Sequence, residues 1–168
     1  MIYTEDVPPP AARRPLLADE DVLADLIAWQ TGGVRSVLVT LVGIEGNAPR
    51  PLGAQMLVAE DGRFHGYLSG GCLEPVIVME AQAVLQEGRN RLVRYGKGSA
   101  YLDLKLPCGS GLDLYFDCSL DANLIAELLA RRAAREPFQL AMNLTAGQTS
   151  IEAVTGDGVA AAEMADGV

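Results

Sequence analysis

Histidine is almost missing from this sequence: His65 is the only one among 168 residues, and none of the three cysteines belongs to a CxxC pair. Structural zinc sites are usually built from such cysteine pairs and from histidines, so the sequence excludes a structural zinc site of this kind. Three cysteines also cannot all pair within one chain. We therefore expect a reducing compartment, the cytoplasm.

Basic residues are scarce as well, because 13 lysines and arginines stand against 22 aspartates and glutamates, and the net charge is −9. Nonspecific binding to nucleic acid depends on Lys and Arg that neutralise phosphates, so nucleic acid is excluded as an expected partner. No apolar run approaches the ~20 residues that span a bilayer, and no basic stretch leads into an apolar run at the N-terminus. The sequence predicts neither export nor a membrane span.

The common nucleotide-binding signatures are also missing: the sequence has neither GxGxxG nor the P-loop pattern, and no internal repeat. It is 49% hydrophobic, which is enough for a chain of this length to bury a core. We expect a flexible proline-rich leader at residues 1–18, one domain at residues 19–155, and a tail at residues 156–168.

The hydrophobic pattern predicts an α/β or α+β fold, in which helices flank a mixed β-sheet. The run at residues 36–44 is continuously apolar, as expected for a central strand buried on both faces. Asp61-Gly62 predicts a hairpin turn between the strands on either side of it. The expected helices lie at 19–30, 72–86 and 121–135, and the expected strands at 36–44, 55–59, 63–68, 91–95 and 111–117, with two more within 138–153.

Two of the cysteines lie in glycine-rich loops. Cys72 follows Gly70-Gly71 at the start of a predicted helix, and Cys108 precedes Gly109 between two predicted strands. Neighbours without bulky side chains leave the sulfur and the backbone N–H groups accessible to an anion, a metal or an electrophile. The helix N-terminus also favours an anion or a thiolate at Cys72. Each thiol is open to two interpretations, a ligand for metal or sulfur and a residue that only packs.

A third loop, residues 46–53, places Arg50 between two prolines and two glycines. Proline fixes φ and glycine permits unusual φ, so this loop presents the arginine at low entropic cost. Arginine binds phosphate or carboxylate with two parallel hydrogen bonds. The loop therefore predicts an anion-binding residue, and a surface ion pair is the structural alternative.

Together the three loops resemble the N-terminal domain of the XdhC/CoxI family, accessory proteins that mature molybdenum hydroxylases such as xanthine dehydrogenase and carbon monoxide dehydrogenase. The matching blocks are residues 46–56, 62–74 and 106–111. Asn47 stands where the family usually has serine, and Ser110 where it often has glycine. Longer members continue into a C-terminal Rossmann-like domain, and this sequence has no second strand-rich half of that kind.

The resemblance implies a chaperone that binds molybdenum cofactor, as molybdopterin or its cytosine dinucleotide form, supports its sulfuration, and delivers it to a hydroxylase apoenzyme. It implies binding without turnover, a cysteine desulfurase as a second partner, and a homodimer. Arg50 and the N–H groups of Gly70 and Gly71 would hold phosphate, and Cys72 and Cys108 would face the metal. The full set of implied cofactor-binding residues is Arg50, Gly70, Gly71, Cys72, Glu74, Cys108 and Gly109.

Two other functions remain open. In a sulfur-transfer enzyme, Cys72 would be the nucleophile and Glu74 the proton donor, although His65 is poorly placed along the chain to act as a base. In a docking module, the acidic surface would bind a partner enzyme and the glycine loops would be tight turns. The simplest structural role for Glu74 is to stabilise the first helical turn, and Cys118 is expected only to pack.

Overall fold

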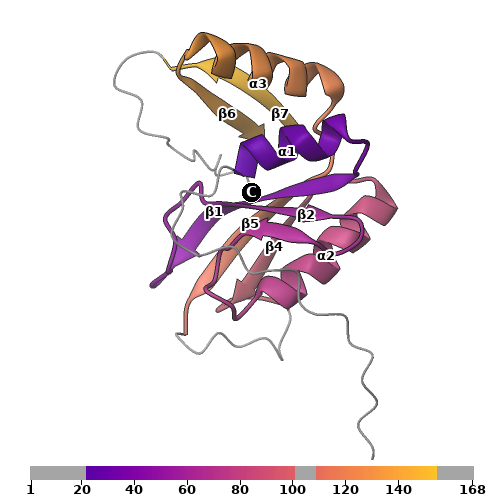
Figure 1. Ribbon diagram of the computed structural model, residues 1–168. Coiled ribbons are helices and arrows are strands. Elements are labelled where there is room, and N and C mark those ends of the chain that lie inside the picture. The colour runs from indigo at the N-terminus through magenta and orange to yellow at the C-terminus, as the bar shows by residue number, and fades with distance from the viewer. Residues whose placement is uncertain (1–21, 101–108, 155–168) are drawn as a thin grey trace, which may run out of the picture.

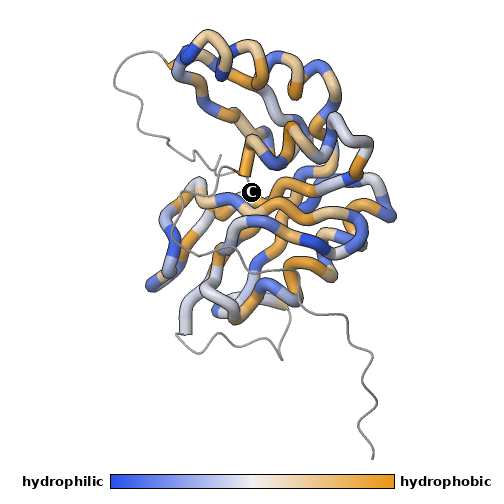
Figure 2. Tube along the Cα trace, in the orientation of Figure 1, coloured by the Kyte–Doolittle hydropathy of each residue, from blue (hydrophilic) through white to orange (hydrophobic). Residues whose placement is uncertain are grey.

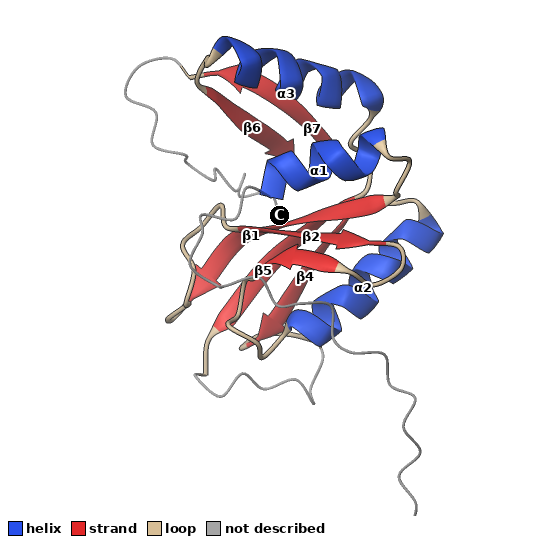
Figure 3. Cartoon of the chain, viewed as in Figure 1, coloured by secondary structure: helices blue, strands red, loops and turns tan. Residues whose placement is uncertain are grey.

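The computed structural model of the protein describes residues 22–100 and 109–154. The predicted leader and tail, and Cys108, lie outside these residues. Each predicted helix and strand is present, with boundaries displaced by a few residues (Figure 3). In chain order the elements are α1 (Val22–Thr31), β1 (Ser36–Glu45), β2 (Gln55–Ala59), β3 (Phe64–Gly66), α2 (Glu74–Glu87), β4 (Arg91–Gly96), β5 (Gly111–Asp117), α3 (Ala122–Ala134), β6 (Phe138–Asn143) and β7 (Gln148–Ala153).

Five strands form one sheet in the order β3-β2-β1-β5-β4, and β6 pairs with β7 in a second sheet (Figure 1). β1 is central, as its apolar run predicts. Every pairing among the described strands is antiparallel. The predicted fold class is confirmed in its α+β form, and the expectation of a mixed sheet is corrected, because no described strand has a parallel neighbour.

β1 is buried on both faces because helices cover both sides of an antiparallel sheet. Val39 belongs to the core that the sheet forms with α2, whereas Leu38 belongs to the core formed with α1 and α3. Both side chains are completely buried. Figure 2 shows the hydrophobic residues concentrated along these middle strands. A continuous apolar run indicates that a strand is buried on both faces, but it does not indicate whether the neighbouring strands are parallel or antiparallel.

The ends of the helices follow local signals in the sequence. α2 has Pro75 in its first turn, where a missing N–H costs nothing, and stops at Gly88, whose φ is 66°. α3 begins after Asp121, whose side chain accepts a hydrogen bond from the N–H of Leu124 at 2.9 Å. These signals therefore fix the end of α2 and the start of α3.

Three connections leave the five-stranded sheet at the same end. Glu45, the last residue of β1, pairs with Gly111, the first residue of β5, and Gly96 at the end of β4 pairs with Gly111 from the other side. Across the sheet, Gly66 at the end of β3 pairs with Met56 near the start of β2. The loops β1–β2, β3–α2 and β4–β5 are therefore neighbours, and they are the three loops singled out by the sequence.

Asn90 joins the second sheet to the first at the opposite end. Its Nδ2 lies 2.9 Å from the Gly147 carbonyl oxygen in the β6–β7 turn and 2.9 Å from Oδ1 of buried Asp117. Its Oδ1 accepts a hydrogen bond from the N–H of Cys118 at 2.9 Å, and the Thr149 hydroxyl donates to Asp117. We call these residues the Asn90 hub.

Candidate functional site

The neighbouring loops are bonded to one another. The N–H of Asn47 in the β1–β2 loop donates to Oγ of Ser110, just before β5, at 3.0 Å. Arg50 in the same loop donates from Nη1 to the hydroxyl of Tyr67, at the start of the β3–α2 loop, at 3.3 Å. The structure thus brings Arg50 into contact with the loop that carries Cys72 (positions 67–73). The spacing of the motifs along the sequence does not reveal this contact.

Arg50 also stacks on Tyr67. The central guanidinium carbon lies 4.6 Å from the centroid of the Tyr67 ring, which is within cation–π range. Nε of Arg50 is buried, and among the described residues it has no hydrogen-bond partner. A buried guanidinium nitrogen without a partner is costly, so Arg50 retains a donor that a bound anion or an ordered water would satisfy.

One carboxylate organises the loop before α2. Glu74 is 5% exposed, and its Oε1 accepts hydrogen bonds from the N–H groups of Leu68 at 3.0 Å and Ser69 at 2.8 Å. Its Oε2 accepts from the Ser69 hydroxyl at 2.5 Å and the Gly71 N–H at 2.8 Å. The Ser69 Oγ in turn accepts from the N–H of Leu73 at 2.7 Å. The loop is therefore folded around Glu74.

These hydrogen bonds also fix the charge of Glu74. Burial by itself disfavours the ionised carboxylate, but the hydrogen bonds from the Ser69 hydroxyl and from the N–H groups of Ser69 and Leu68 outweigh burial. The pKa of Glu74 therefore lies below its usual value. Glu74 serves its own loop as an ionised acceptor, which is a poor starting point for donating a proton.

The segment between Ser69 and α2 presents backbone and sulfur to solvent. Gly70 and Gly71 have φ of 75° and 111°, a region that favours glycine, and a Cβ on either would meet nothing within 4 Å. Cys72 is exposed and lies two residues before the start of α2. Among residues 22–100 and 109–154, no hydrogen bond satisfies the N–H of Gly70 or Cys72. The loop therefore offers two free donors and a thiol at a helix N-terminus.

The third loop is described from Gly109 onward, and Cys108 lies outside the described residues. Gly109 is exposed with φ of 70° and open space on its Cβ side. Ser110 is 2% exposed, and its hydroxyl is the group that accepts from Asn47. The two positions that depart from the family pattern thus meet, and their contact holds the first loop against the third.

Sequence reasoning misses Tyr67 and Ser69 as parts of this site. A tyrosine beside a glycine carries no local signal for stacking on an arginine 17 residues away. Ser69 had a recognisable signal, since a serine shortly before a helix that begins with an acid is a common source of capping hydrogen bonds. Its hydroxyl here bonds Glu74 and Leu73 instead of forming the standard capping box.

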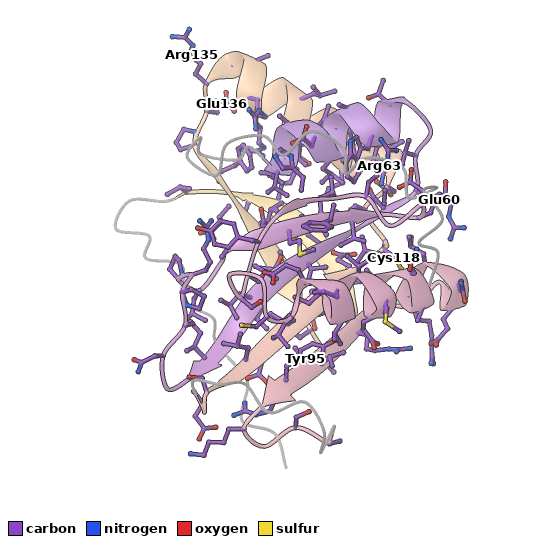
Figure 4. The ribbon with its side chains drawn as sticks, turned by 60° about the horizontal axis from the view of Figure 1, so that its bottom comes forward. Glu60, Arg63, Tyr95, Cys118, Arg135 and Glu136 are labelled. Carbon is purple, nitrogen blue, oxygen red and sulfur yellow. The ribbon has the colours of Figure 1, made fainter. Side chains whose placement is uncertain are left out.

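Cys118 and His65 are not part of these loops. Cys118 is at the far end of the sheet, toward Glu60 and Arg63 of the β2–β3 turn (Figure 4). Burial and then the charge of Asp117 raise the pKa of the Cys118 thiol. His65 pairs with Leu57 across β2 and β3, and its ring also contacts Asp25 of α1.

Two cavities at the far end of the sheet are distinct from the site. One of about 310 Å³ is lined mainly by α3 and β7, and one of about 200 Å³ is lined by Arg35 and Cys118 among others. Within the described ranges, no three His, Cys, Asp or Glu side chains are grouped as a metal would need. None of the described helices is long and apolar enough to cross a membrane.

Comparison with known proteins agrees with the family named by the motifs. Residues 29–96 match the model of the XdhC and CoxI family, which confirms that resemblance. The chain is 47% identical over 108 residues to the molybdenum cofactor insertion chaperone PaoD of Escherichia coli (strain K12), which covers 64% of this chain and 34% of the relative. It is 38% identical over 76 residues to a probable xanthine dehydrogenase subunit of Bacillus subtilis (strain 168), covering 45% of this chain and 23% of that protein.

Among solved structures, a xanthine dehydrogenase from Bacillus halodurans superposes with a TM-score of 0.53 at 30% sequence identity, covering 67% of this chain and 34% of that one. This chain therefore spans about a third or less of the length of the relatives that it matches.

Proposed function

We propose that this chain, whose residues 29–96 match the model of the XdhC and CoxI family, binds molybdenum cofactor as cargo and supports its sulfuration and insertion into a molybdenum hydroxylase. The observation that carries the proposal is the meeting of Arg50 with the exposed Cys72 loop at one end of the sheet. The 47% identity to a protein named for molybdenum cofactor insertion supports the choice of cargo.

The loops fit the anionic part of such a cargo. Within the part of the chain that the structure describes, Nε of Arg50 is buried without a hydrogen-bond partner, and the N–H groups of Gly70 and Cys72 have no partner either. Phosphate needs donors of this kind, and a guanidinium beside a helix N-terminus supplies them together with positive charge. Arg50 and the backbone of residues 70–72 would therefore hold the phosphate of molybdopterin or of its cytosine dinucleotide form.

The thiols would contact the molybdenum end of the cargo. The cargo brings its own molybdenum, so the protein needs only to protect a reactive, thiophilic metal and its incoming sulfur. Cys72 is exposed on a loop held open by glycines, and we assign it to this role, with Cys108 and Gly109 as its partners in the third loop. No resident metal site is required for such a carrier.

A carrier accounts for Glu74 better than a sulfur-transfer enzyme does. An enzyme of that kind would use Glu74 to protonate a leaving group beside Cys72. Glu74 instead has a lowered pKa and accepts hydrogen bonds from its own loop. Its place in the proposal is to fix the loop that contacts the cofactor.

The partners follow from the carrier role. A hydroxylase apoenzyme would receive the cargo and a cysteine desulfurase would supply sulfur, both in the cytoplasm. Among the described residues, β3 and β4 are the outer strands of the five-stranded sheet, and an outer strand is where a second copy of the chain would pair to form a homodimer.

The experiment that tests the proposal is retention of the cargo. The purified protein is incubated anaerobically with molybdenum cofactor and passed through gel filtration, and retained molybdenum and oxidised-pterin fluorescence are measured. We expect stoichiometric retention by the wild type and by Cys118→Ala, whose thiol lies at the far end of the sheet. Cys72→Ala should lose most of the retained molybdenum. Retention by none of these proteins would overturn the proposal for this chain.

A further inference from the structure

Tyr67 contacts Arg50 in two ways at once. Its ring supports the guanidinium at 4.6 Å, and its hydroxyl accepts a hydrogen bond from Nη1 at 3.3 Å. Arginine side chains normally keep several rotamers available, and a stack combined with a hydrogen bond removes most of that freedom. Arg50 is thus held before any ligand arrives.

The two residues come from different loops. Arg50 lies in the β1–β2 loop, which has no helix or strand of its own, whereas Tyr67 directly follows β3 and precedes Leu68. Leu68 is completely buried, and its N–H is bonded to Glu74. Tyr67 therefore stands on the firmly anchored side, and Arg50 is the residue that depends on the contact.

The contact leaves one unpaired donor on Arg50 and a hydroxyl proton on Tyr67. Nε of Arg50 is buried without a partner among the described residues, on a guanidinium whose Nη1 is engaged by Tyr67. A hydroxyl that accepts from Nη1 can still donate its own proton. We propose that Tyr67 positions Arg50 for the phosphate of the cargo and adds its own O–H to the anion-binding donors. The identity of the anion rests on the proposed function, but the positioning does not.

The positioning is tested first without any ligand, through the Nε–H resonance of Arg50 in a ¹H–¹⁵N spectrum, assigned with Arg50→Lys. We expect a dispersed, slowly exchanging signal in the wild type because Nε is buried. Tyr67→Phe should keep the signal with faster exchange, since the ring remains, and Tyr67→Leu should lose it. Two results would overturn the inference: an Nε–H signal that is unchanged in Tyr67→Leu, or one that already exchanges rapidly with solvent in the wild type. Neither result depends on which ligand the protein binds.

The anion is then tested with inorganic pyrophosphate, by titration calorimetry of the wild type, Tyr67→Phe, Arg50→Gln and the double variant. We expect Tyr67→Phe alone to weaken pyrophosphate binding about three- to tenfold. In a protein that already carries Arg50→Gln, the same substitution should have little further effect, because Tyr67 acts largely through Arg50. Equal losses in both backgrounds, accompanied by a lower melting temperature, would mean that Tyr67 only supports the fold and would overturn the inference.

The outcome stays separate from that of the carrier proposal. The protein could bind pyrophosphate with coupled effects of the Tyr67 and Arg50 substitutions and yet retain no molybdenum cofactor. That result would support the positioning of Arg50 by Tyr67 and contradict molybdenum cofactor as the cargo. Retention of cofactor that is unchanged in Tyr67→Leu would leave the carrier proposal intact and overturn this inference.

Discussion

At the scale of single residues, the site depends on which donors are used and which remain free. Glu74 takes up the N–H groups of Leu68, Ser69 and Gly71, and leaves those of Gly70 and Cys72. One acid therefore both closes the loop and determines which of its N–H groups a ligand can reach.

Glu74→Gln should destabilise the protein by about 2–3 kcal/mol, since an amide cannot accept all of these hydrogen bonds and places an NH₂ against a backbone donor. Urea unfolding measures the change. The lowered pKa fixes the pH dependence: the stabilisation is fully present above the ordinary value of 4.5 and is lost as the pH falls through the lower folded-state pKa. The difference between variant and wild type should therefore shrink below pH 4.5.

Glu60→Gln is the matched control, because Glu60 is exposed in the β2–β3 turn, and its effect should stay within about 0.5 kcal/mol. If the stability difference between Glu74→Gln and the wild type stays constant from neutral pH to pH 3, Glu74 does not stabilise the loop as an ionised hydrogen-bond acceptor.

Alanine substitutions at Gly70 and Gly66 distinguish the cost of backbone strain from the cost of steric crowding. Gly70→Ala should cost about 1 kcal/mol from its positive φ alone, because the new Cβ meets nothing within 4 Å. Gly66 has a similar φ of 84°, but a Cβ there would lie 2.6 Å from the Gln55 carbonyl oxygen, so Gly66→Ala should cost about 3 kcal/mol. Denaturant titration distinguishes the two, and equal costs would contradict the open space beside Gly70.

At the scale of elements, the sequence predicts what is decided locally. The β2–β3 hairpin follows from Asp61-Gly62, and the end of α2 follows from Gly88, because each depends on the φ that one residue allows. Strand direction was not predictable from the apolar run of β1. The contact between Arg50 and Tyr67 was not predictable either, since it depends on which strands become neighbours.

The Asn90 hub is the main polar link between the β6–β7 hairpin and the sheet. Asn90→Ala should lower the free energy of unfolding by about 3 kcal/mol, because it leaves the carbonyl of Gly147 and the N–H of Cys118 without their partners. Hydrogen exchange in β6 and β7 should accelerate more than in β1. Asn123→Ala, at the exposed start of α3, is the control, and uniform acceleration across both sheets would contradict a local link.

At the scale of the whole molecule, two cores share the same strands. Leu38 and Phe116 are completely buried on opposite faces, Leu38 under α1 and α3 and Phe116 under α2. Because β1 and β2 contribute side chains to both cores, neither face can lose its packing while the other keeps its structure. The molecule should therefore unfold as one unit.

Leu38→Ala and Phe116→Ala should each cost about 3–5 kcal/mol, because each leaves a cavity in a fully buried position. Thermal unfolding followed by the fluorescence of Trp29, the only tryptophan, and by far-ultraviolet circular dichroism should give coincident transitions in both variants. Trp29 reports on the α1 side alone, so a fluorescence transition that separates from the dichroism in Phe116→Ala would show that the faces unfold independently.

The placement of the Asn90 hub has a practical consequence. The β6–β7 turn that it holds lies at the end of the sheet opposite the three loops, and Thr145 in that turn is exposed while its N–H is bonded to Asn143. A biotin attached at this residue would immobilise the protein on a sensor surface with its cysteine and arginine loops facing the flowing solution. Binding of a partner protein to those loops could then be measured without competition from the attachment point.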